Sequence, residues 1–101
     1  MPMLEADRVV WAAMFARTNY GHSLPSASEV ARYRTAAKHG TNLPAMVNLV
    51  CADLCESDGH YDMFLDEAQS WSSCFASKEL DYIFQIWPNK RTVWEASEVP
   101  A

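Results

Sequence analysis

Glycine is scarce in this sequence, at three of 101 residues. Dipeptides typical of tight hairpin turns are nearly absent as well. An all-β fold needs a turn after roughly every eight to twelve residues, and such turns depend on glycine, asparagine and aspartate. The shortage of turn residues therefore disfavours an all-β fold.

The sequence also lacks the long apolar runs of membrane proteins, since none reaches about eighteen residues. Its beginning includes Glu5, Asp7 and Arg8 and holds no clean apolar segment, so no signal peptide is expected. The chain has three cysteines, an odd number that without a secretory signal favours reduced thiols. We therefore expect a cytoplasmic protein without a membrane span.

Basic residues are few in the second half of the sequence and missing from one acidic stretch within it. Residues 1–50 hold five basic and three acidic side chains, whereas residues 51–101 hold three basic and ten acidic ones. Six carboxylates lie between Asp53 and Glu67 with no lysine or arginine among them. This acidic balance disfavours non-specific binding to nucleic acid or to an anionic membrane. It suits a protein partner with a basic surface.

Apolar residues, by contrast, are plentiful. Half of the sequence is hydrophobic, and it includes four tryptophans, four tyrosines and four phenylalanines. This composition excludes a disordered chain, and the length is that of one domain. We assign residues 1–96 to a single domain and residues 97–101 to a loose C-terminal tail.

The periodicity of apolar residues predicts four helices. The expected ranges are 4–19, 26–38, 43–55 and 60–76. Ser26 and Glu29 have the spacing of a capping box at the start of the second helix. Gly40 lies where a helix C-terminus favours a residue with positive φ.

The third segment, 43–55, is apolar on nearly every side, and only Pro44, Asn48 and Asp53 interrupt it. A helix that is apolar all round and too short to span a bilayer is expected to lie buried in a core. We therefore predict that this helix is the centre on which the other helices pack.

The fourth segment, 60–76, has the clearest amphipathic pattern. The face predicted to be buried carries Phe64, Ala68, Trp71 and Phe75. The face predicted to be exposed carries Asp62, Asp66, Gln69 and Ser73.

The segment 80–95 fits two interpretations. Helical spacing is found in Leu80, Ile83, Phe84 and Trp87. Strand-like alternation is found in Leu80, Tyr82, Phe84 and Ile86. Aromatic and β-branched residues favour strands, but an isolated hairpin is only marginally stable. We favour a short helix ended by Pro88, with a C-terminal β-hairpin as the alternative. The predicted fold class is thus an all-α, single-domain bundle of four to five helices.

A zinc site would have to be built from Cys51, Cys55, His60 and Cys74. Structural zinc sites usually pair cysteines across a tight knuckle, which a spacing of four on one helix does not provide. A free cysteine commonly packs as a small buried hydrophobe instead. The three histidines are scattered, and no phosphate-binding or nucleophile motif occurs. We therefore predict no metal, no cofactor and no enzymatic activity; a small enzyme with a Cys/His site assembled in the fold is the third hypothesis.

The segment 36–46 resembles a helix-turn-helix, with Gly40 at the turn and a basic helix before it. The residues of this basic patch are Arg32, Arg34 and Lys38. The segment departs from the motif at His39 and Thr41. The following helix, 43–55, would have to present polar side chains to DNA bases, and it has few. A DNA-binding regulator that uses the basic patch is the second hypothesis.

The aromatic residues point to a protein interface. Most of them are expected in the core, and a minority left on the surface would suit an interface, where tryptophan and tyrosine are enriched. The predicted interface residues are Trp87, Trp94, Tyr82, Asp62 and Asp66.

The leading hypothesis is a small, acidic, non-enzymatic regulatory protein that docks on a partner protein and inhibits it by occlusion. This class includes phage-encoded inhibitors of bacterial defence or regulatory complexes. The partner is expected to be a protein, with a basic surface suited to the acidic half of the chain. A homodimer is the second assembly considered.

Overall fold

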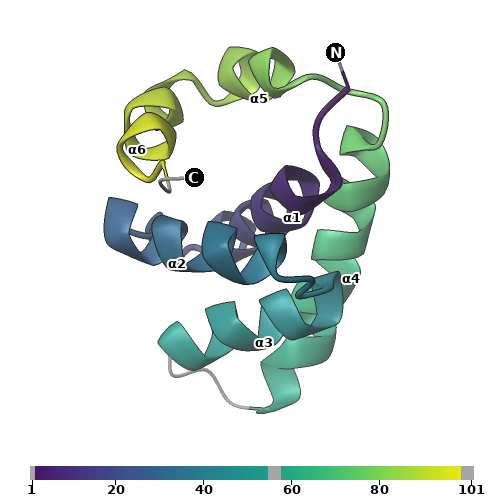
Figure 1. The fold of residues 1–101 in the computed structure, drawn as a ribbon. Coiled ribbons are helices and arrows are strands. Elements are labelled where there is room, and N and C mark those ends of the chain that lie inside the picture. The colour runs from purple at the N-terminus through teal and green to yellow at the C-terminus, as the bar shows by residue number, and fades with distance from the viewer. Residues whose placement is uncertain (1, 55–57, 99–101) are drawn as a thin grey trace.

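The first helix, α1 (Glu5–Asn19), lies at the centre of the structure (Figure 1). The computed structural model describes residues 2–54 and 58–98. Three helices pack directly on α1: α2 (Ala27–Lys38), α3 (Leu43–Asp53) and α4 (Asp58–Phe75). The chain then arches over the other side of α1 as α5 (Leu80–Ile86), the 3-10 helix η1 (Pro88–Lys90) and α6 (Arg91–Ala96). Residues 80–97 are called the C-terminal arm below.

Local sequence signals explain where α2 and α3 begin and end. The Ser26 hydroxyl accepts from the Glu29 amide at 3.2 Å, and the Glu29 carboxylate accepts from the Ser26 amide at 3.0 Å. The predicted capping box is therefore confirmed. Gly40 ends α2 with a φ of +95°, as predicted. Asn42 then caps α3 by accepting from the Ala45 amide at 3.1 Å.

The prediction that the segment 43–55 forms the central helix is wrong. On α3 only Met46, Val47, Val50 and Cys51 are buried, while Pro44, Ala45, Asn48 and Ala52 are exposed. The central helix is α1, in which every residue from Val9 to Arg17 is buried. The physical reason is the number of neighbours: α1 is covered by α2, α3, α4 and the arm, whereas α3 packs on one side only. Much of the outer surface of α3 consists of small residues such as alanine, whose exposure costs little.

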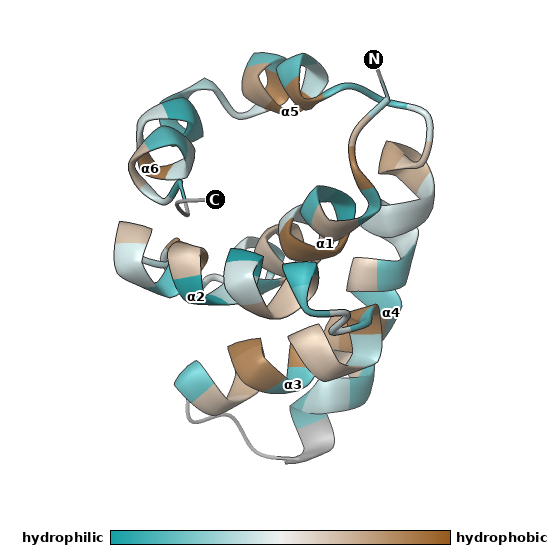
Figure 2. Ribbon diagram, in the orientation of Figure 1, coloured by the Kyte–Doolittle hydropathy of each residue, from teal (hydrophilic) through white to brown (hydrophobic). Residues whose placement is uncertain are grey.

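The amphipathic pattern of α4 is confirmed. Phe64, Ala68 and Phe75 are buried and Trp71 is half-buried. The opposite face is exposed at Asp62, Asp66, Gln69 and Ser73. Figure 2 shows this contrast as alternating polar and apolar bands along α4.

The C-terminal β-hairpin considered for residues 80–95 is not formed, because every residue of the segment except Trp87, a bend between α5 and η1, is helical. Its helical stripe is the one that packs: Ile83 and Phe84 are buried, and Trp87 is half-buried. The Phe84 and Trp87 rings contact Trp11 of α1, each with ring centroids 5.8 Å apart. The segment after Pro88 adds a sixth α-helix, so the described residues form six rather than four or five.

The packed part of the chain extends through Ser97, which the sequence had assigned to a loose tail. Ser97 is buried, and its hydroxyl accepts from the Arg34 guanidinium at 3.1 Å. Residues 99–101 of the predicted tail lie outside the described residues. The radius of gyration, 12.4 Å, is that of a compact unit of this length.

Candidate functional site

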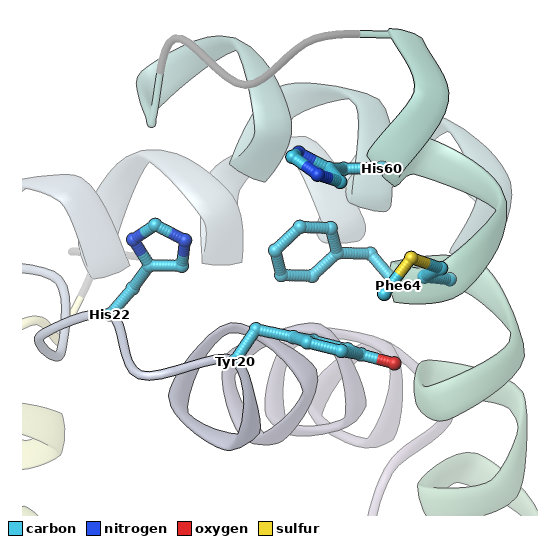
Figure 3. Close-up of a pocket in the computed structure, with 5 residues that line it drawn as sticks. Tyr20, His22, His60 and Phe64 are labelled. Carbon is cyan, nitrogen blue, oxygen red and sulfur yellow. The ribbon is translucent and has the colours of Figure 1, made fainter.

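A hollow of about 170 Å³ opens where the end of α1 meets the start of α4 (Figure 3). Its lining residues, called the aromatic hollow below, are Tyr20, His22, His60, Met63 and Phe64. Figure 3 shows the Phe64 ring between His60 and Tyr20, with His22 facing it from the loop that follows α1.

The end of α1 positions Tyr20 and His22. Gly21 has a φ of +81°, a conformation that favours glycine, so α1 ends at Asn19 with Tyr20 as its C-cap residue. The buried Arg17 then holds the next loop, because its Nε donates to the Ser23 carbonyl at 2.7 Å. The loop that carries His22 is thereby fixed to the end of the central helix.

The start of α4 supplies the other three residues. His60, Met63 and Phe64 are three and four positions apart, and this spacing places them on one side of a helix. The Tyr20 and Phe64 rings meet edge to face, with centroids 4.9 Å apart. The centroids of the His22 and Phe64 rings are 6.0 Å apart. Such aromatic contacts stabilise the junction of α1 with α4 and hold the rings in place around the hollow.

The aromatic hollow has a buried floor and an exposed rim. Phe64 is 2% exposed, whereas Tyr20 is 40% and Met63 45% exposed. Across the described residues, the large hydrophobic side chains that are exposed are Leu4, Tyr20, Met63 and Ile86. A single exposed apolar side chain is ordinary, but a gathered apolar patch often marks an interaction site. Two of these four side chains lie at the same hollow.

The surroundings of the hollow on α4 are acidic. The helix carries no lysine or arginine between Asp58 and Phe75, and both Asp62 and Asp66 are exposed. The Glu67 carboxylate, one turn after Met63, accepts from the Asn19 amide and from the Trp71 indole. The hollow therefore adjoins a surface of unbalanced negative charge.

The interface residues predicted from the sequence lie in different parts of the structure. Trp94 is buried against Trp11, with ring centroids 4.8 Å apart, and so offers little surface to a partner. Trp87 and Tyr82 are half-buried on the arm, and Tyr82 contacts the end of α4. Asp62 and Asp66 lie in the first half of α4, nine or more helical rises of about 1.5 Å from Phe75, the residue that Tyr82 contacts. These residues do not form one surface.

The predicted basic patch is engaged within the chain. Arg34 donates to the Trp94 carbonyl at 3.0 Å and lies over the Trp94 ring, 3.9 Å from its centroid. Arg32 forms an ion pair with Asp53 of α3. Lys38 is exposed at the end of α2, and its charge and that of Arg34 act on the half-buried Asp7. Two of the three basic side chains therefore hold the fold together.

Asp53 connects α2 to α3 through hydrogen bonds from Arg32 and Tyr33. Burial alone would raise the pKa of Asp53, but the two donors together outweigh burial and lower it. The pKa of the buried Tyr33 hydroxyl is raised by its burial and by the Asp53 carboxylate. The hydroxyl therefore stays a neutral donor at ordinary pH, so this cluster has the character of a structural clamp.

The residues weighed as zinc ligands are spread over the fold. Cys51 is buried in α3, Cys74 is exposed on α4, and Cys55 lies outside the described residues. His60 belongs to the aromatic hollow. Within residues 2–54 and 58–98, no group of three or more histidine, cysteine, aspartate or glutamate side chains is arranged to hold a metal ion.

The aromatic hollow was not predicted from the sequence, although two signals pointed to it. Met63 stands beside Asp62 on the polar side of the amphipathic pattern, where an apolar residue has no packing role. Tyr20 precedes the glycine that ends α1 and so stands at a helix terminus. Neither signal shows that the two residues meet, because they are far apart in the sequence.

No protein family, curated protein or solved structure matches this chain. Among the described helices, none is both long and apolar enough to cross a membrane.

Proposed function

We propose that this chain is a small protein-binding regulator that docks on a basic partner protein through the aromatic hollow. The observation that carries the proposal is the joint exposure of Tyr20 and Met63 at one hollow. Aromatic residues and methionine are enriched in protein interfaces relative to the rest of the surface. Binding there would remove both apolar side chains from water.

The size of the hollow supports a protein partner over a cofactor. Sites for drug-sized molecules and cofactors usually enclose roughly 300–1,000 Å³. The aromatic hollow, at about 170 Å³, is smaller than that range. It suits a single side chain from a larger partner, which is how interface hot spots are commonly built.

The charge near the hollow supports a basic partner. Asp62 and Asp66 are exposed on a helix without lysine or arginine. Complementary charge speeds association and disfavours wrong partners more than it adds affinity. A regulator of this kind acts by covering the partner's basic surface, and inhibition by occlusion is the mode we propose.

A comparison of two substitutions tests the proposal. Met63 and Ile86 are 45% and 44% exposed, and they lie on α4 at the hollow and on α5 of the arm. Because both are surface positions, Met63→Lys and Ile86→Lys should each change the free energy of unfolding by no more than about 0.5 kcal/mol. Each variant and the unchanged protein are used as bait in a lysate of the source cells.

We expect one partner, retained in stoichiometric amount by the unchanged protein and by Ile86→Lys, and lost by Met63→Lys. The matched exposure means that a general effect of a new surface charge would appear in both variants. Retention that survives Met63→Lys, or that only Ile86→Lys abolishes, would place the interface elsewhere. Absence of any stoichiometric protein partner would remove the proposal altogether.

A further inference from the structure

The aromatic hollow presents the chemistry of a site for a cation. Tyr20, His22 and Phe64 contribute rings, and Figure 3 shows these rings gathered around one opening. The face of an aromatic ring is its negative side, so a cation placed over it is attracted. Tyr20, the most exposed of these rings, offers the best surface for such a contact.

The charges beside the hollow favour a cation as well. Asp62 immediately precedes Met63 in the sequence, and Asp66 follows it by three positions, close to one helical turn. Both carboxylates are exposed, and α4 carries no basic side chain to neutralise them. Of these two carboxylates, Asp66 lies beside Met63 at the rim of the hollow, because residues three apart are neighbours on a helix and adjacent residues are not. A cationic side chain at the rim would therefore meet the Tyr20 ring and the Asp66 carboxylate.

Among the described residues, arginine forms the two shortest ring–cation pairs. Arg34 lies 3.9 Å from the centroid of the Trp94 ring, and Arg91 lies 4.6 Å from that of Phe84. The third arginine pair, Arg32 with Tyr33, is 5.5 Å long. It lies between the two lysine pairs, which are 5.2 Å long for Lys78 with Tyr82 and 5.7 Å long for Lys90 with Trp87. The planar guanidinium stacks closely on a ring while its N–H groups donate in the ring plane. Arg34 does both, since it also donates to the Trp94 carbonyl.

We infer that the aromatic hollow binds an arginine side chain of the partner protein. The guanidinium stacks on the Tyr20 ring and donates to the carboxylate of Asp66, while its methylene stem covers Met63. The inference rests on the proposed function and narrows it, because it selects arginine over both lysine and an uncharged apolar anchor.

Four short peptides that differ only in their central residue test this inference. The central residue is arginine, lysine, leucine or citrulline, the last being the uncharged counterpart of arginine. Binding is followed by the NMR chemical shift of the Met63 methyl group, up to low-millimolar peptide. We expect arginine to bind about two- to fivefold more tightly than citrulline, which corresponds to an exposed cation–π contact. Lysine should bind less tightly than arginine because its ammonium group cannot stack on the ring, and leucine should bind most weakly.

Two variants of the exposed Tyr20 separate stacking from simple charge attraction. Tyr20→Phe keeps the ring and should keep the preference for arginine over lysine. Tyr20→Leu keeps an apolar side chain but removes the ring, and should reduce the preference to about onefold. Both variants are checked for an unchanged circular dichroism spectrum.

Three results would overturn the inference: equal binding of arginine and lysine, tightest binding of leucine, or a preference for arginine that survives Tyr20→Leu. Failure of every peptide to bind, while the lysate partner still requires Met63, would reject arginine and leave the proposed function standing. A lysate partner that is insensitive to Met63→Lys would reject both.

Discussion

Two clusters of aromatic residues in this chain differ in their exposure to solvent. Under the C-terminal arm, Trp94 and Phe84 close over Trp11, and all three are buried. At the other cluster, Tyr20 lies against Phe64 but remains 40% exposed. The first cluster is core and the second is surface. Abundance of tryptophan therefore does not identify the exposed aromatic surface of this protein.

The strongest test of this contrast is removal of the ring at the centre of the closed cluster. Trp11 is buried and contacts four other aromatic rings, so Trp11→Ala should lower the free energy of unfolding by about 3–5 kcal/mol. Tyr20→Ala, at the open cluster, should cost about 1 kcal/mol. Denaturant unfolding monitored by circular dichroism measures both values. Similar losses for the two variants would mean that the clusters do not differ as described.

A second test removes contacts that Arg34 makes with the closed cluster. Arg34→Ala removes the stacking on Trp94 and the hydrogen bonds to the Trp94 carbonyl and the Ser97 hydroxyl. The expected loss of stability is about 2 kcal/mol, since hydrogen bonds from charged groups are stronger than average. Hydrogen exchange should accelerate in α6 more than in α3. Lys38→Ala, on the same helix but exposed, is the control, and an equal effect from it would contradict the assigned role of Arg34.

A third test concerns the clamp between α2 and α3, which lies outside both clusters. Tyr33→Phe removes the hydroxyl that donates to Asp53 and should cost about 1–2 kcal/mol at neutral pH. Because the pKa of Asp53 is lowered in the fold, its contribution is present above the unfolded pKa of about 4. It is lost as pH falls through the lower folded value. The difference in stability between the two proteins should therefore shrink below about pH 4.

Unfolding curves recorded between neutral and acidic pH check this prediction. Arg32→Ala provides a comparison, because the Arg32 side chain is 54% exposed and its ion pair should contribute at most about 1 kcal/mol. A difference between Tyr33→Phe and the unchanged protein that stays constant on acidification would show that the hydroxyl does not act through the Asp53 carboxylate.

Much of the fold follows from local sequence signals. The capping box at Ser26, the positive φ of Gly40 and the buried side of α4 were all predicted, because each depends on residues within a few positions of one another. Element boundaries likewise fall within two residues of those expected for the first four helices.

The identity of the central helix depends on information that local patterns do not contain. The segments of α1 and α3 are both apolar on more than one side, and only the number of neighbouring elements decides which is enclosed. The two interpretations of residues 80–95 depended on packing in the same way, because Trp11 provides the surface on which the helical stripe lies.

The aromatic hollow also depends on tertiary structure. Tyr20 and Met63 come from different helices, and each alone is an ordinary exposed residue. Their meeting requires α1 to end at Asn19, ahead of Gly21, and α4 to begin near that end. Sequence periodicity predicts the face that a helix buries, but an exposed site shared by two helices leaves no periodic signal.

We propose that the partner contacts the hollow and not the arm. The methionine methyl groups can test this proposal directly. Met63 lies at the hollow. Met3 is half-buried near the start of the arm, since its backbone amide donates to the carbonyl of Lys78, which precedes the arm. Met14 and Met46 are buried. Methyl NMR spectra are recorded before and after addition of the partner. We predict that the Met63 methyl resonance shifts most, while those of Met3, Met14 and Met46 stay close to their positions in the free protein. A shift at Met3 without one at Met63 would contradict the account.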